Sequence, residues 1–230
     1  MYFKISNTAE RQEIERESNA LFKYPNLYTS QVLINGEEEV SCPIITMEEK
    51  QELSWAIWGL LPPDYQEDWE LFQDMNNTLN INIDLLETDL WFTESLKNKR
   101  CVIPVTGFFT TLLRNGEIFP YYISCKTSKI FFLAGLYTVL DDGFITFSIL
   151  TGPIDNHLKK YQNLVNKMPI ILDEESKEEW LNENTEPSRA MDILETPRPS
   201  TLSANPIAKE LFNQGISYES MLLPFDYFDK

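Results

Sequence analysis

Cysteine and histidine, the residues that most often carry nucleophilic chemistry, are scarce in this chain, and its many carboxylates are expected by chance in so acidic a sequence. The sequence holds three cysteines and one histidine, His157. A nucleophile activated by a histidine base, or a metal site with a histidine ligand, would have to use that residue. His157 stands beside Asn156 at the start of a predicted amphipathic helix, which is typical of a surface or capping histidine. The eight glycines form neither G-x-G-x-x-G nor G-x-x-x-x-G-K phosphate-binding patterns.

The three cysteines indicate plain buried thiols. Their number is odd, they lack C-x-x-C spacing, and they lie in apolar or strand-like segments, as Cys42, Cys101 and Cys125. A disulfide framework or a zinc site would need more ligands at closer spacing. We therefore expect neither a metal nor any other cofactor.

The charge of the chain opposes binding to polyanions. Thirty-six acidic and 19 basic residues give a formal charge of −17, and no Lys/Arg cluster forms a basic patch. No apolar run approaches the roughly 20 residues that span a bilayer, and the first residues do not resemble a signal peptide. These features favour a cytoplasmic protein without membrane contact.

The elements that must position any site follow from local sequence patterns. Asn7 and Glu10 have capping-box spacing before a first predicted helix. Asp173 is the predicted N-cap of the last one. The predicted helices cover residues 8–19, a segment around 69–76, and residues 87–97, 156–166 and 174–181.

β-branched and aromatic runs predict strands, and the turn sequences Asn115-Gly116 and Asp142-Gly143 predict hairpins between them. Three prolines make residues 182–203 look like a loop excursion, and residues 204–230 form a C-terminal segment. With no internal repeat, the whole of 1–230 is predicted to be one domain. The predicted strands cover residues 31–34, 101–105, 121–125, 130–137, 144–151 and 168–172.

Seven short blocks, in this order, are similar to one protein family. They read WGLLP (58–62), NTLN (77–80), KRCVIPVTGFF (99–109), PYYI (120–123), AGLY (134–137), TFSILT (146–151) and MPIIL (168–172). Together they resemble the SRAP family, the SOS response-associated peptidases or abasic-site processing proteins. The resemblance is strongest over residues 1–181, with a weaker echo in 205–210 and 217–224.

The resemblance implies an α+β fold, a curved and partly barrel-like mixed sheet surrounded by helices. It also implies binding of single-stranded DNA and a covalent link to the opened sugar of an abasic site in the DNA damage response. That chemistry uses a cysteine directly after the initiator methionine, whose amine and thiol close a thiazolidine ring. An asparagine and an arginine position the amine and the DNA, and a glutamate and a histidine supply acid–base steps.

Most of these positions hold other residues here. The cysteine position is Tyr2, whose phenol has a pKa near ~10 and cannot close a five-membered ring. The asparagine matches Asn80, and the arginine falls on Asn82. The glutamate falls on Thr110 and the histidine on Gln162. Lys167 replaces the arginine of the family's Arg-Met-Pro block and keeps its charge.

The leading hypothesis is therefore a pseudoenzyme, an SRAP-like scaffold without covalent chemistry that binds an unknown protein partner. A second hypothesis keeps non-covalent binding of single-stranded or damaged DNA, with Lys4, Arg100 and Lys167 as its cationic supports. A third is an enzyme with relocated chemistry. In the first two, Tyr2 should enter the old site and lie near Asn80, Thr110 and Gln162.

Overall fold

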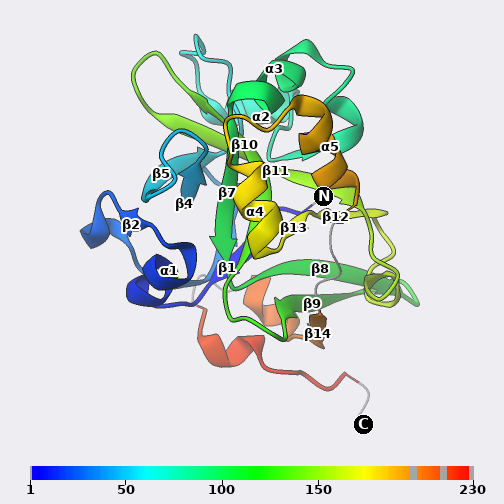
Figure 1. Cartoon of the computed structure of the whole chain (residues 1–230). Helices are drawn as coiled ribbons and strands as arrows, with labels where there is room; N and C mark the ends of the chain where they lie inside the picture. Colours follow the sequence, from blue (N-terminus) through cyan, green and yellow to red (C-terminus); the bar gives the residue numbers. More distant parts are fainter. Residues whose placement is uncertain (1, 197–200, 213–216, 228–230) are drawn as a thin grey trace.

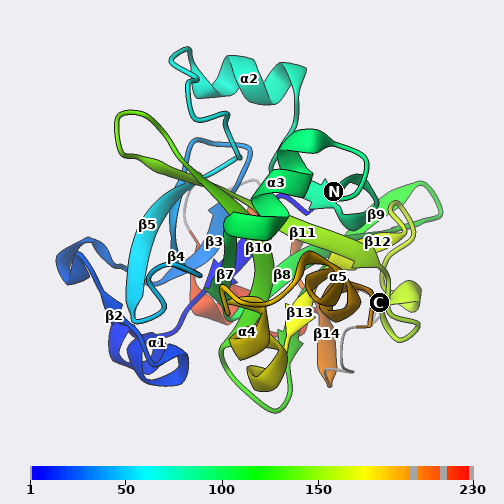
Figure 2. The ribbon, with the colours of Figure 1, turned by 45° about the horizontal axis from the view of Figure 1, so that its top comes forward.

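The computed structural model describes residues 2–196, 201–212 and 217–227. At its centre five strands close into a small barrel (Figures 1 and 2). Neighbouring strands run antiparallel except where β5 meets β11 in parallel, Ile57 opposite Thr146, which closes the ring. In ring order the strands are β5 (Glu52–Trp58), β4 (Ser41–Thr46), β7 (Arg100–Val105), β10 (Phe131–Val139) and β11 (Ile145–Pro153).

Shorter strands extend the barrel at its edges. Both β6 (Asn80–Asn82) and β12 (Lys167–Pro169) pair with β11, while β13 (Ile171–Leu172) pairs with β10. The two-residue strand β2 (Leu21–Phe22) runs parallel to the start of β5. Almost all side chains of β7 and β10 are buried, because both faces of these strands are covered.

A second sheet continues from the first at Thr106, the one residue between β7 and the next strand. Its order is β14 (Leu202–Pro206), β9 (Glu117–Cys125), β8 (Gly107–Arg114), β1 (Lys4–Asn7) and β3 (Gln31–Asn35). The two-residue turn between β8 and β9 has Asn115 at φ 53° and Gly116 at φ 79°, which confirms the predicted hairpin. The fold is the predicted α+β class with a curved, partly barrel-like mixed sheet.

Helices cover the outside of this β core. Helix α3 (Leu90–Asn98) packs against β7 and β10, and α4 (Glu174–Trp180) packs against β7 and β13 (Figures 1 and 2). Helix α5 (Pro187–Glu195) packs against α3 and α4. Helix α1 (Arg11–Ser18) follows β1, and α2 (Trp69–Met75) follows β5. Single 3-10 turns are η1 (Pro25–Leu27), η2 (Ile83–Leu85), η3 (Leu158–Lys160), η4 (Lys209–Phe212) and η5 (Glu219–Leu222). No helix of the described residues is long and apolar enough to cross a membrane.

The predicted start of the first helix is wrong by several residues. Asn7 belongs to β1 and donates from its side chain to Pro104 O at 3.0 Å. The helix begins at Arg11, and its capping box joins Glu10 to Glu13. Pairing of β1 with two neighbouring strands keeps the chain extended as far as Asn7. A local capping pattern cannot anticipate that long-range pairing.

Two further expectations fail for identifiable reasons. Residues 156–166 form no α-helix, only the turn η3, because the side chain of Gln162 binds the carbonyls of Val165 and Lys167 and holds the backbone in an irregular course. The stretch 182–203 is no simple loop. Pro187 occupies the first turn of α5, where proline is favoured, and Leu202 begins β14. Residues 197–200 of that stretch lie outside the described part.

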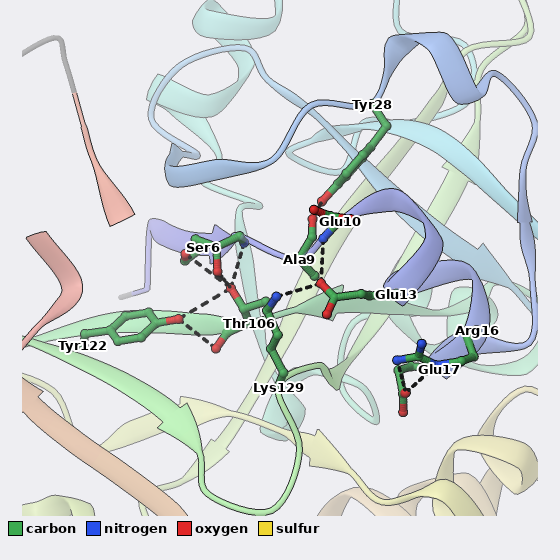
Figure 3. Close-up of polar contacts among 11 residues, drawn as sticks. Ser6, Ala9, Glu10, Glu13, Arg16, Glu17, Tyr28, Thr106, Tyr122 and Lys129 are labelled. Atoms are coloured by element: carbon green, nitrogen blue, oxygen red, sulfur yellow. Dashed lines mark hydrogen bonds and ion pairs between the residues drawn. The ribbon is translucent and has the colours of Figure 1, made fainter. Parts of the chain in front are cut away.

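A polar network fixes the end of β1 from which the chain leads into α1. Thr106 Oγ1 accepts from Thr8 N at 3.0 Å and lies 3.4 Å from Ser6 Oγ, while Tyr122 OH donates to Thr106 O at 2.8 Å (Figure 3). Lys129 pairs with Glu13 at 2.7 Å in the same region. The C-terminal end of β1 is thereby tied to Thr106, the residue that joins the two sheets.

Candidate functional site

Tyr2 precedes β1 and is almost fully buried. Only 2% of its surface is exposed, and its ring meets the edge of Phe108 at 5.4 Å between centroids and 82° between planes. The phenol hydroxyl donates to the side-chain oxygen of Gln162 and lies 2.9 Å from Lys167 O. Tyr2 therefore fills the position at which the sequence resemblance places a reactive cysteine.

Gln162 uses the full hydrogen-bonding capacity of its amide. Its oxygen accepts from Tyr2 and from Thr110 Oγ1, the latter at 2.6 Å. Its nitrogen donates to Val165 O at 2.9 Å and to Lys167 O at 2.7 Å. A buried amide with two acceptor and two donor sites occupied has no free site for substrate and no titratable proton. The Gln162 side chain therefore has a structural role, because it joins Tyr2, Thr110 and the backbone at Val165 and Lys167.

Asn80 holds the backbone beside Tyr2. It begins β6, and its side-chain nitrogen donates to Tyr2 O at 2.7 Å. Its side-chain oxygen is buried and has no hydrogen-bond partner among the described residues. Tyr2, Asn80, Thr110 and Gln162 thus gather in one place, as the sequence predicted, although they come from widely separated parts of the chain.

Asn82 lies at the exposed edge of the same region, in a triad with Asp84 and Lys167. It caps η2 and donates from its side chain to Asp84 Oδ2 at 2.8 Å. Lys167 Nζ, from β12, lies 3.0 Å from Asn82 Oδ1 and 2.8 Å from Asp84 Oδ2. The hydrogen bond from Lys167 lowers the pKa of Asp84 below its ordinary value. The carboxylate therefore offsets the one positive charge that this position retains.

Tyr2 and the two buried cysteines, Cys42 and Cys101, are held in their protonated forms, whereas Cys125, which was expected to be buried, is half-buried. Burial raises the pKa of Tyr2 well above its ordinary value, although hydrogen bonds with Thr110 and Gln162 act in the opposite direction. Burial likewise raises the pKa of the Cys42 thiol to about 12 and that of Cys101 well above normal. All three cysteines are free thiols. A protonated, enclosed phenol or thiol is a poor nucleophile at neutral pH.

A pocket of about 390 Å³ opens beside Tyr2. Three aromatic rings, Phe3, Phe109 and Phe212, help to line it together with Tyr2 itself. At its rim Lys4 Nζ lies 2.7 Å from Glu37 Oε2 and 5.7 Å from the centroid of Phe212. The pocket could hold a flat apolar group, but its cation already has an anionic partner.

The expectation that Arg100 supports DNA binding is wrong. Arg100 has no exposed surface, and its guanidinium donates to carbonyls at the ends of two helices at distances of 2.7–2.9 Å. It also lies over the ring of Trp180, at 5.7 Å from the centroid. The acceptors are the backbone oxygens of Leu96, Lys97, Trp180 and Asn182.

His157 is exposed and lies 5.9 Å from the ring of Tyr161, which agrees with a surface position. Within the described ranges, no cluster of three or more His, Cys, Asp or Glu side chains could hold a metal ion. The sequence reasoning missed the two carboxylates that pair with the lysines of the site, Glu37 and Asp84. No sequence pattern points to the first, since 33 residues separate Glu37 from Lys4.

Comparisons with known proteins support the family resemblance found in the sequence. Residues 1–214 match the family described as SOS response associated peptidase (SRAP). The chain is 31% identical over 144 residues to abasic site processing protein YoqW of Bacillus subtilis, and 31% over 143 residues to YobE of the same organism. These matches cover 60% of this chain, which spans 61% of the length of YoqW and 62% of that of YobE.

Solved structures show the same fold. A crystal structure of a protein from Bacteroides thetaiotaomicron superposes with a TM-score of 0.87 at 25% identity, covering 97% of this chain and 99% of the other. A protein from Bordetella bronchiseptica superposes with a TM-score of 0.73 at 17% identity, covering 90% and 99%.

Proposed function

The chain belongs to the SOS response associated peptidase (SRAP) family, and we propose that it is a non-catalytic member that has lost covalent capture of abasic sites. In this role it acts as a binding scaffold for a protein partner. The observation that carries the proposal is the burial of Tyr2, whose phenol is bound to Gln162 and Lys167 where a reactive thiol would be needed.

The polar neighbours of Tyr2 support the same conclusion. Gln162 and Thr110 replace the two acid–base groups, and the Thr110 hydroxyl donates to Gln162 at 2.6 Å. Acid–base assistance is typically worth about 10²–10⁴ in rate. Loss of the thiol together with both proton-transfer groups therefore removes the chemistry and not merely part of its efficiency.

The test is a crosslinking assay with labelled single-stranded DNA that contains one abasic site. The wild-type chain and Tyr2→Cys are incubated beside YoqW, and adducts are resolved on a denaturing gel. We expect no adduct from either form of this chain, since Asn82, Thr110 and Gln162 remain unchanged in the variant. A denaturation-resistant band from the wild type would overturn the proposal. A band from Tyr2→Cys alone would show that only the thiol is missing.

A second candidate is non-covalent binding of single-stranded DNA, which the aromatic lining of the Tyr2 pocket favours. Stacking of a base on an aromatic ring contributes about 1–3 kcal/mol, but such sites normally add a positive groove. Here Lys4 pairs with Glu37 and Lys167 with Asp84, while Arg100 is enclosed. The paired lysines and the charge of −17 place this candidate second.

Titration of a labelled undamaged oligonucleotide at several salt concentrations separates the two candidates. Real phosphate contacts give a log–log slope near −0.7 per contact on a single strand. We expect weak binding without such a slope. Tight binding at physiological salt with a clear slope would replace the protein-partner role with the DNA role.

We further propose a cytoplasmic location, which the free thiols of Cys42 and Cys101 support.

A further inference from the structure

A second hollow lies along β5 and shares no lining residue with the Tyr2 pocket. It consists of two adjoining pockets, of about 700 and 290 Å³, which have Glu39, Ile57 and Phe144 in common. We call this continuous hollow the β5 groove. It runs from Tyr24 and Leu27 at one end to Tyr65 at the other.

The groove exists because β5 changes partners along one of its edges. Strand β2 pairs with Glu52 and Leu53, and β11 pairs with Ile57 and Trp58. Among the described strands none pairs with the residues between, 54–56, on that edge. In Figure 2, β2 lies near the lower end of β5 and the β10–β11 turn near its upper end. The β5 groove lies beside this unpaired part of β5, with Ser54 and Trp55 among its lining residues.

Large apolar side chains are exposed around this interval. Leu27 and Phe144 are each 63% exposed and Tyr24 is 55% exposed, while Trp55 and Ile57 form part of the floor.

The charges that line the groove are predominantly negative. Glu39, Glu67 and Asp142 are exposed and line its two parts. The one cation among the lining residues, Lys23, lies 3.0 Å from Glu52 and is offset by it. An apolar floor beneath an acidic rim attracts a ligand that is apolar and basic at once, and it repels nucleic acid.

We propose that the β5 groove binds a peptide segment of a partner protein, in which apolar side chains are flanked by Lys or Arg. The apolar side chains pack against Trp55, Ile57 and Phe144, and the basic residues face the acidic rim. A second copy of this chain is disfavoured, because its charge of −17 would repel the same rim. The inference supplies a partner class for the proposed scaffold, but it rests on a different surface.

The test uses a phage-displayed library of random peptides about twelve residues long, a length that covers a typical peptide-binding groove. The library is selected on the immobilised full chain, and the enriched peptides are synthesised with a fluorescent label. We expect enrichment of apolar residues flanked by Lys or Arg. Affinity should fall about ten-fold or more in Phe144→Ser, because truncation of a central apolar anchor costs about 1.4 kcal/mol or more, and 1.4 kcal/mol is ten-fold in affinity.

Two further variants sharpen the test. Glu39→Lys combined with Asp142→Lys should weaken the same peptides, and more so at low salt. Leu90→Ser, which removes an 84% exposed side chain from the start of α3, is the matched control and should leave affinity unchanged. The proposal is overturned if no peptides are enriched, if enriched peptides are acidic, or if they bind Phe144→Ser as well as wild type. Self-association that requires Phe144, measured by sedimentation, would overturn it in favour of a dimer. The crosslinking assay at Tyr2 is independent of all these outcomes.

Discussion

Replacement of Tyr2 by alanine should destabilise the fold rather than merely alter a surface. The ring is 2% exposed and contacts Phe108 edge-on. Removal of a buried aromatic ring typically costs about 3–5 kcal/mol. The space left by the ring adjoins the pocket of about 390 Å³, so water can enter it, which limits the cavity term. We therefore expect a loss near the lower end, about 3 kcal/mol.

The hydroxyl should contribute far less than the ring. In Tyr2→Phe, Gln162 still accepts from Thr110, and Lys167 O still accepts from Gln162. No acceptor is left wholly unpaired, so the loss should be about 1 kcal/mol or less. The contrast between the two variants separates packing of the ring from hydrogen bonding by the phenol.

The measurement is urea unfolding followed by tryptophan fluorescence, supported by thermal unfolding. Each kcal/mol lowers the melting temperature by about 2–4 °C in a chain of this size. Tyr24→Ala is the control, because Tyr24 is 55% exposed and its loss should change stability by no more than about 0.5 kcal/mol. If Tyr2→Ala lost less than about 1 kcal/mol, or no more than Tyr24→Ala, Tyr2 would not be locked in place, and the argument for a filled site would fail.

Three further predictions follow from the same contacts. The pKa of the Tyr2 phenol is raised in the folded state, so the stability that the neutral phenol contributes is complete below the unfolded pKa of about 10 and is lost as pH rises above it, by up to about 1.4 kcal/mol per pH unit. In urea titrations, Tyr2→Phe should flatten this loss of stability at alkaline pH. An unchanged slope would contradict a raised pKa at Tyr2. Arg100→Met should cost about 3–5 kcal/mol because it removes the guanidinium donor from four backbone carbonyls, although Asn182 O still accepts from Thr185 N. Exposed Arg16→Met should stay within about 0.5 kcal/mol in the same assay. Equal effects would show that the buried guanidinium is dispensable. Glu37→Gln combined with Asp84→Asn removes the anionic partners of Lys4 and Lys167. The log–log slope of oligonucleotide affinity against salt concentration should then steepen by about 0.7 per lysine. An unchanged slope would mean that the pairing of these lysines is not what limits DNA binding.

Much of the fold could be predicted from local sequence because its cause is local. The Asn115-Gly116 turn needs two residues that adopt positive φ, and the structure has both there. The β-branched and aromatic runs became β7, β10 and β11 of the barrel and β9 of the second sheet, because such side chains suit strands that are buried on one face or on both. Helix α4 begins after Asp173, whose carboxylate accepts from Ser176 N.

The long-range contacts could not be predicted in this way. Pro187 reads equally well as part of a loop or as the first turn of a helix, and burial of Ala190 and Leu194 decides for the helix. Arg100 reads as a surface cation, but the ends of α3 and α4 bring four carbonyls to its guanidinium. In both cases packing against distant elements decides between local alternatives.

At the site itself, the sequence alone determined which side chains are present: Asn80 keeps the asparagine that the family resemblance calls for, and a tyrosine, an asparagine, a threonine and a glutamine stand where it calls for titratable or charged groups. Only the tertiary structure decided what they do. Tyr2 and Gln162 lie 160 residues apart in the chain and are joined by one buried hydrogen bond, while Lys4 and Lys167 meet their carboxylates across separate strands. Residue type limits the chemistry that is possible, but proximity sets burial, partners and pKa, and proximity between distant segments is produced by strand pairing rather than by any local pattern.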